Sequence, residues 1–172
     1  PEHGPLRDAL LPEARDCLRR MREGLSLLES DDDARLAFNI ANQSIQSTIR
    51  WRGIENDFAW RKFQIAFVLS CLESTANPSS EDRDRLDLLW VATGGGKTEA
   101  YILLIAFVMA LRRIQGARNG VQWFGVDVFT RYTLRLLTIQ QFRRALGVIT
   151  AMEQIRAGSI QLPEGVDPRI MG

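Results

Sequence analysis

Three consecutive glycines followed by Lys97 and Thr98 constrain this chain more than any other feature of its sequence. The glycines stand between a short apolar run, residues 86–92, and a longer one, residues 100–111. A short apolar run is typical of a buried strand, and a long one is typical of a covered helix. Glycines let backbone N–H groups curl around a phosphate, and the start of the following helix adds a favourable dipole. The pattern therefore predicts a strand, a phosphate-binding turn and a helix in succession.

Each residue of this turn has a chemical role in that prediction. Lys97 is expected to bridge the β- and γ-phosphates of a nucleoside triphosphate, and Thr98 is expected to ligate Mg²⁺, so both are candidate catalytic residues. The usual pattern has glycine six positions before the lysine, where this chain has Val91. The alternative is a flexible glycine loop that merely precedes Lys-Thr. The residues expected to hold the nucleotide are Thr93, Gly94, Gly95, Gly96, Lys97, Thr98 and Glu99.

Basic residues are unevenly distributed along the chain. Residues 1–99 hold 17 acidic and 13 basic residues, whereas residues 100–172 hold 4 acidic and 9 basic ones. A segregated basic half is typical of a surface that binds a polyanion, although arginines on solvated helix faces would give the same count. Only Lys62 and Lys97 are lysines among the 22 basic residues. A compact ammonium directly after the glycines suits a position between phosphates better than a broad guanidinium does.

Several classes of protein are disfavoured by composition. Cys17 and Cys71 lie far apart without a CxxC motif, which argues against a disulfide framework or a zinc site. His3 is the one histidine, so a histidine-dependent catalytic triad is not expected. The longest apolar run is shorter than the ~20 residues that span a bilayer, and no signal sequence opens the chain. We therefore expect a cytoplasmic, globular protein without a membrane partner.

Hydrophobic periodicity and turn signals predict alternating helices and strands after a helical N-terminal region. The acidic run at residues 31–33 is expected to cap the second helix, and residues 115–120 are expected to form a loop. The expected helices are residues 12–29, a second helix that starts at the acidic run and extends toward residue 50, and residues 58–72, 99–111 and 134–156. The expected strands are residues 86–92, 121–130 and 169–172. Strands alternating with helices predict an α/β fold with a parallel sheet.

Several segments resemble known families. Residues 90–101 (WVATGGGKTEAY) resemble the first motif of superfamily 2 helicases, which ends TGxGKT. The same residues and residues 126–145 (VDVFTRYTLRLLTIQQFRRA) resemble the helicase subunit of DISARM phage-defence systems, the DrmA family, as do residues 35–41 and 63–72. The resemblance implies a RecA-like ATP-binding domain in residues 58–172. An N-terminal helical segment, residues 1–57, would precede it.

Further residue roles are implied by this resemblance. Gln64 is similar to the glutamine that reads adenine, because a side-chain amide can pair with its N6 and N7 atoms. The alternative is a partly buried polar residue at a helix start. Residues 133–140 resemble the conserved block with an arginine five residues before a glutamine, although Thr130 and Arg131 are an alternative match. The implied contacts to nucleic-acid phosphates come from Thr130, Arg131, Thr133, Arg135 and Gln140.

The resemblance implies the ATP-binding portion of an ATP-dependent DNA helicase or translocase that serves in anti-phage defence. Its cofactors would be ATP and Mg²⁺, and its partners DNA and other defence-system proteins. Such enzymes need a strand ending in Asp-Glu, and this chain contains no Asp-Glu dipeptide. We therefore expect the domain to be truncated before that motif and the chain alone to be inactive. The alternatives are a P-loop NTPase switch that acts on proteins, and a basic helical scaffold that binds nucleic acid without nucleotide.

Overall fold

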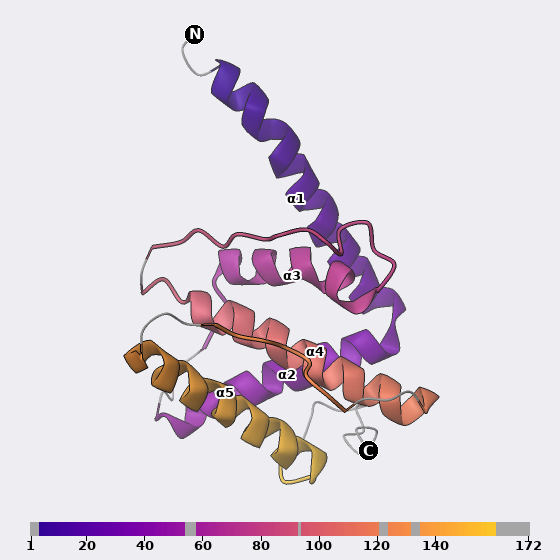
Figure 1. Cartoon of the computed structure of the whole chain (residues 1–172), viewed down its shortest axis with the longest axis vertical. Helices are drawn as coiled ribbons and strands as arrows, with labels where there is room; N and C mark the ends of the chain where they lie inside the picture. Colours follow the sequence, from indigo (N-terminus) through magenta and orange to yellow (C-terminus); the bar gives the residue numbers. More distant parts are fainter. Residues whose placement is uncertain (1–3, 54–57, 93, 121–123, 132–134, 161–172) are drawn as a thin grey trace.

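The structure is a computed structural model that describes residues 4–53, 58–92, 94–120, 124–131 and 135–160. Within these ranges the chain forms five α-helices. The N-terminal part of α1 extends away from the other helices, whereas its C-terminal part packs against α3 (Figure 1). The helices are α1 (Gly4–Ser30), α2 (Asp32–Trp51), α3 (Lys62–Ala76), α4 (Lys97–Asn119) and α5 (Arg135–Arg156).

Helix α2 begins where the acidic run predicts. The Asp31 side chain accepts hydrogen bonds from the backbone N–H groups of Asp33 and Ala34, at 2.8 and 3.0 Å. This is the usual chemistry of an N-cap, which satisfies donors that the helix itself leaves unpaired. The apolar face of α2 then packs into the core, with Ile40 and Ile45 buried. The predicted capping of the second helix is therefore confirmed.

Helix α4 lies at the centre of the packing (Figure 1). Leu103, Phe107 and Ile114 are completely buried, and α4 contacts α2, α3 and α5. Burying a large apolar side chain contributes about 1.5–3 kcal/mol, so this helix supplies much of the core. The sequence correctly predicts an apolar helix that must be covered. Helices cover it on these sides, rather than the predicted sheet.

One described helix, α4, is long and apolar enough by length and composition to cross a membrane. Half of its most apolar window is buried inside the fold. The core helix of a soluble protein passes the same test, so this finding is weak support for a membrane span.

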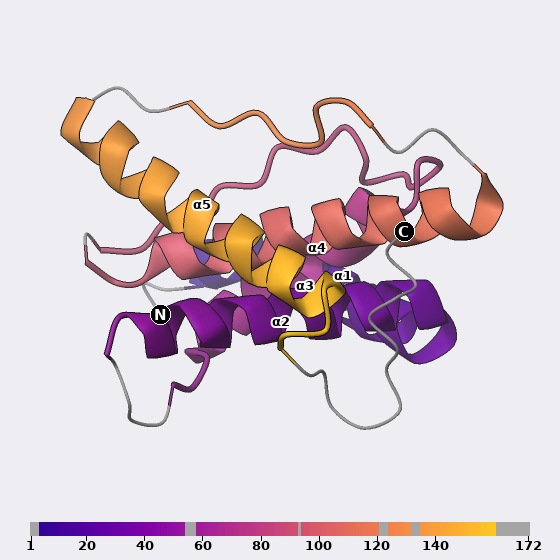
Figure 2. The same ribbon diagram turned by 90° about the horizontal axis from the view of Figure 1, so that it is seen from below.

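The predicted α/β fold with a RecA-like parallel sheet is wrong for the part of the chain that the structure describes, which contains no strand. Residues 86–92 and 124–131 have no regular secondary structure, and they run along the same side of the helices (Figure 2). Leu86, Leu88 and Trp90 are 94%, 79% and 88% exposed. An apolar run forms a strand only where a second strand pairs with its backbone N–H and C=O groups. The sequence of a short run does not determine whether such a second strand is present.

The remaining expectations for individual elements have mixed outcomes. Helices α3 and α5 begin at Lys62 and Arg135, close to the predicted positions, whereas α1 begins at Gly4 rather than Pro12. The loop predicted at residues 115–120 is wrong, because α4 continues to Asn119. Packing of α4 outweighs the cost of a glycine inside a helix, which is about 1 kcal/mol. The expected strand at residues 169–172 lies outside the described residues.

The boundary predicted between residues 57 and 58 falls at the edge of residues 54–57, which the structure does not describe. The described helices on its two sides share one apolar core, since α2 packs against α4 and α5. The division into an N-terminal helical segment, residues 1–57, and an ATP-binding region, residues 58–172, stays a prediction.

Candidate functional site

The glycine turn enters α4 in a conformation that suits glycine. Gly94 and Gly96 have φ values of +81° and +89°, in the left-handed region that other residues rarely adopt. The N–H of Gly95 donates to the carbonyl of Ala92 at 3.0 Å, which closes the turn. Gly96 occupies the N-cap position of α4, and no side chain makes a capping hydrogen bond there. The first N–H groups of α4 therefore remain suited to an anion.

The side chain of Gln64 links this turn to the start of α3 by hydrogen bonds. Its Nε2 donates to the carbonyl of Gly96 at 2.7 Å, and its Oε1 accepts from the N–H of Arg61 at 2.8 Å. The guanidinium of Arg61 donates in turn to the carbonyl of Gly95 at 2.8 Å. A Cβ on Gly96 would lie 2.8 Å from Gln64 Nε2, so a side chain at residue 96 would displace this amide. Gln64 is buried, and both ends of its amide contact protein groups.

The side chains that follow the glycines also have protein partners. Lys97 Nζ donates to the carbonyl of Val91. Within the described ranges, no carboxylate pairs with Lys97, so a protein anion does not neutralise its ammonium. Thr98 Oγ1 lies 3.0 Å from the hydroxyl oxygen of Tyr101, within hydrogen-bond distance. A phosphate or a cation at this turn would have to replace these contacts.

Helix α5 reaches the turn through two side chains that the sequence did not single out for this role. Gln141 Nε2 donates to Thr98 Oγ1 at 3.3 Å, and Arg144 Nη1 donates to Glu99 Oε1 at 2.9 Å. Helical spacing was the available signal, since residues 141, 144 and 148 share a face and Val148 is buried.

The Gln141 side chain is only partly satisfied. Its Oε1 is buried and has no hydrogen-bond partner in the described part of the chain. A buried acceptor without a partner costs about 1–3 kcal/mol, so its position is set by the packing around it. Gln141 thus connects α5 to the hydroxyl for which the sequence predicts a role in Mg²⁺ binding.

The residues expected to contact nucleic acid are partly brought together. Thr130 and Arg131 are exposed, and with Gln141 they line a cavity of about 330 Å³. Gln140 is also exposed, but it lines a different cavity, between α2, α4 and α5. Two predicted regions, the turn and residues 130–131, therefore approach the same part of α5.

The side chains of three predicted site residues lie outside the described part of the structure. Thr93 and Thr133 lie outside the described residues. Arg135 is the first residue of α5, and its side chain is also outside the described part. Their roles stay predictions.

The segment that leads into the turn is attached to the helices by a partly buried ion pair, in which Arg20 is buried and Asp87 is more exposed. Arg20, on α1, donates to the two carboxylate oxygens of Asp87 at 2.5 and 2.8 Å. The Arg20 guanidinium holds the pKa of Asp87 below its usual value. Burial, with the nearby Asp87 carboxylate, raises the pKa of Cys71 to about 12, so this thiol stays protonated near neutral pH. The segment therefore has a fixed anchor at residue 87.

Comparisons with known proteins give one partial similarity. No protein-family model matches the chain, and no solved structure matches it. The chain is similar to a Bacillus paralicheniformis protein described as DISARM protein DrmA, with 37% identity over 167 residues. The match covers 83% of this chain, which spans about 15% of the length of that relative. The predicted resemblance to a DISARM protein is therefore confirmed for that portion, whereas helicase activity stays a prediction.

Proposed function

We propose that this chain binds ATP and Mg²⁺ through residues 93–99 and provides the ATP-binding part of a DNA helicase or translocase in anti-phage defence. The observation that carries the proposal is the glycine turn that enters the uncapped N-terminus of α4 directly before Lys97. Such a helix start attracts anions through its unpaired N–H groups and its dipole. The similarity to a DISARM protein supports the role in defence, with other defence-system proteins as partners.

The proposed roles follow from the contacts of each side chain. Lys97 would exchange the Val91 carbonyl for the β- and γ-phosphates, and an ammonium gains more from an anion than from a neutral acceptor. Thr98 would turn its hydroxyl toward Mg²⁺ and release Gln141. Gln64 would contact adenine by giving up one of its two amide contacts. The described residues hold no cluster of three acidic, histidine or cysteine side chains for a metal, so Mg²⁺ would depend largely on the phosphates.

A nucleotide titration tests the proposal. The purified protein is titrated with a fluorescent ATP analogue, with and without Mg²⁺, and compared with Lys97→Ala. We expect about tenfold weaker binding or more for the variant, because a hydrogen bond to a charged group contributes about 1.5–3 kcal/mol. Lys62→Ala is the matched control, since Lys62 is the one other lysine and is exposed at the start of α3. Equal binding by the wild type and Lys97→Ala would sink the proposal.

DNA binding is proposed for Thr130, Arg131, Thr133, Arg135 and Gln140. Replacing Arg131 and Arg135 together by glutamine should weaken binding to all DNA sequences alike, because phosphate contacts carry no sequence information. The slope of log association constant against log salt concentration is negative, and its magnitude should decrease by about two if each arginine contacts one phosphate. Affinity lost for particular sequences alone would contradict this assignment.

A helical scaffold that binds nucleic acid without nucleotide is the second candidate. The regular structure of the described residues is entirely helical, which favours this candidate. The side chains of Gln64 and Lys97 also already make hydrogen bonds to backbone carbonyls of this chain, rather than being free for a nucleotide. Salt-sensitive DNA binding without Mg²⁺-dependent binding of the ATP analogue would support it. If the protein binds the ATP analogue but does not bind DNA, an NTPase switch that acts on proteins is favoured instead.

A further inference from the structure

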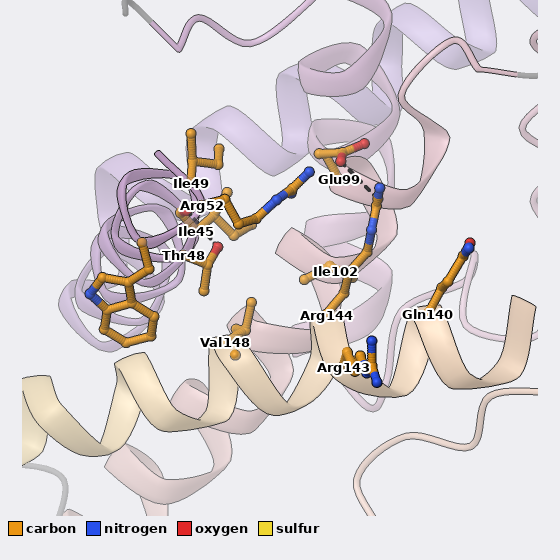
Figure 3. A pocket seen from close by; sticks show the side chains of 12 residues that line it. Ile45, Thr48, Ile49, Arg52, Glu99, Ile102, Gln140, Arg143, Arg144 and Val148 are labelled. Carbon is orange, nitrogen blue, oxygen red and sulfur yellow. Dashed lines mark hydrogen bonds and ion pairs between the residues drawn. The ribbon is translucent and has the colours of Figure 1, made fainter. Parts of the chain in front are cut away.

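A cavity of about 510 Å³ lies between the C-terminal half of α2, the start of α4 and the middle of α5 (Figure 3). Its size falls within the range of about 300–1,000 Å³ that is typical of small-molecule sites. Three different helices line it, so its shape depends on how they pack. Residues 94–98 of the glycine turn do not line the cavity, whereas Glu99, at the start of α4, does (Figure 3).

One side of this cavity is apolar. Ile45 and Ile49 come from α2, Ile102 from α4 and Val148 from α5, and all four residues are buried. Trp51 also lines the cavity, and its residue is 50% exposed. An aliphatic floor beside a partly exposed indole suits a flat, apolar group, because aromatic rings stack on both kinds of surface.

The other side of the cavity is positively charged. Arg52, Arg143 and Arg144 line it together with a single carboxylate, that of Glu99. Glu99 pairs with Arg144, and no described carboxylate pairs with Arg52 or Arg143. Figure 3 shows the Arg52 side chain extending from the end of α2 toward the Glu99–Arg144 pair. The lining therefore has two positive charges that no described acidic residue balances.

We propose that this cavity binds a nucleoside monophosphate group. The phosphate lies between Arg52 and the arginines of α5, and the base lies on the aliphatic floor beside Trp51. A phosphate monoester carries about −1.5 to −2 charge at pH 7, which matches two unpaired guanidiniums better than the single charge of an internal phosphodiester. A free mononucleotide and the phosphorylated 5′ end of a DNA strand both present this chemistry.

Binding measurements by calorimetry separate these two sources. The purified protein is titrated with dAMP, deoxyadenosine, and a short oligodeoxyadenylate with or without a 5′ phosphate. We expect about tenfold weaker binding or more for each ligand without the terminal phosphate. Binding of dAMP indicates a free nucleotide, and binding of the phosphorylated oligonucleotide alone indicates a strand end. Equal affinity with and without the phosphate, or no binding of either phosphorylated ligand, would overturn the proposal.

Variants locate the site. Arg52→Ser should weaken binding of the phosphorylated ligand about tenfold, whereas Arg50→Ser should leave it nearly unchanged, because Arg50 is exposed nearby on α2 and does not line the cavity. Trp51→Leu should weaken binding of that ligand but not competition by inorganic phosphate. Circular dichroism checks that each variant keeps its helices.

Lys97→Ala distinguishes this proposal from nucleotide binding at the glycine turn. The variant should keep its affinity for the phosphorylated ligand, since Lys97 does not line the cavity. If Lys97→Ala removes that binding, or if Arg50→Ser weakens it as much as Arg52→Ser does, the ligand does not occupy this cavity. If Lys97→Ala loses binding of the ATP analogue but keeps binding of the phosphorylated ligand, the cavity proposal is supported.

Discussion

The surroundings of Gln64 in the fold differ from those that its predicted role requires. The sequence predicts that its amide reads adenine, and the structure shows it buried against the backbone of the glycine turn. The amide joins the start of α3 to the start of α4, two positions that are far apart in the sequence. These contacts order the turn, and a contact that Gln64 gives up to reach adenine would reduce the net gain on binding.

Replacing Gln64 by alanine should destabilise the fold by about 1–3 kcal/mol, because the Gly96 carbonyl and the Arg61 N–H lose their partner. Urea unfolding measures this change in free energy. Gln46→Ala on α2 is the control, since Gln46 is half-buried and makes no side-chain hydrogen bond among the described residues. Similar losses in the two variants would show that the contacts of Gln64 contribute nothing particular.

The ion pair between Arg20 and Asp87 makes stability depend on acidity. Arg20 lowers the pKa of Asp87 in the folded protein below its value in the unfolded chain, which is about 4. The pair therefore stabilises the fold above that value, and the contribution is lost as the pH falls further. Between pH 5 and pH 3, the free energy of unfolding of the wild type should fall more steeply than that of Asp87→Asn.

Unfolding by urea at a series of pH values measures this difference. Asp84→Asn is the matched control, because Asp84 is exposed three residues away and has no described side-chain partner. Asp84→Asn should keep the pH dependence of the wild type. If Asp87→Asn keeps it as well, the pair does not contribute to acid sensitivity.

The crossing of α1 and α3 depends on a close approach at Gly24. A Cβ there would lie 2.0 Å from the backbone carbonyl oxygen of Leu69, a distance at which the helices must separate. Gly24→Ala should therefore destabilise the protein by about 1–3 kcal/mol and lower its melting temperature. Thermal unfolding followed by circular dichroism measures the shift.

Gly147 on α5 provides the comparison for Gly24. A Cβ at Gly147 would lie 3.4 Å from Thr48 Cγ2, at about van der Waals distance. Gly147→Ala should be neutral or stabilise the protein by up to about 1 kcal/mol, since alanine favours a helix. A melting temperature that falls equally in both variants would contradict the argument from close packing.

The most unusual property of the whole molecule is the exposed apolar surface of its two irregular segments. Six large apolar side chains of these segments are 65–94% exposed, and both segments run on the same side of the helices (Figure 2). The residues are Leu86, Leu88, Trp90, Phe124, Val126 and Phe129. Large exposed apolar surfaces of this kind promote association.

We therefore expect the isolated chain to associate as its concentration rises, and Leu88→Asp combined with Val126→Asp to reduce this association. Sedimentation velocity over a range of concentrations measures it. Leu25→Asp is the control, because Leu25 is about half exposed on α1 and belongs to neither segment. The prediction is wrong if the control reduces association as much as the double variant does.

The sequence alone determined the features that depend on neighbouring residues. The cap at Asp31 follows from local chemistry, as do the periodicity of α2 and α5, the apolar character of α4, and a glycine turn directly before a helix. In each case the interacting groups lie within a few positions of one another in the sequence, so the local sequence pattern is enough to predict the interaction.

Only the tertiary structure decided what the remaining residues do. Residues 86–92 are apolar enough for a strand, but a strand depends on backbone partners from another segment, and none of the described segments supplies them. Gln64 and Arg144 likewise take partners more than thirty positions away. The choice between sheet and helical packing therefore depended on long-range contacts, which the free energy of the whole fold selects and local sequence does not specify.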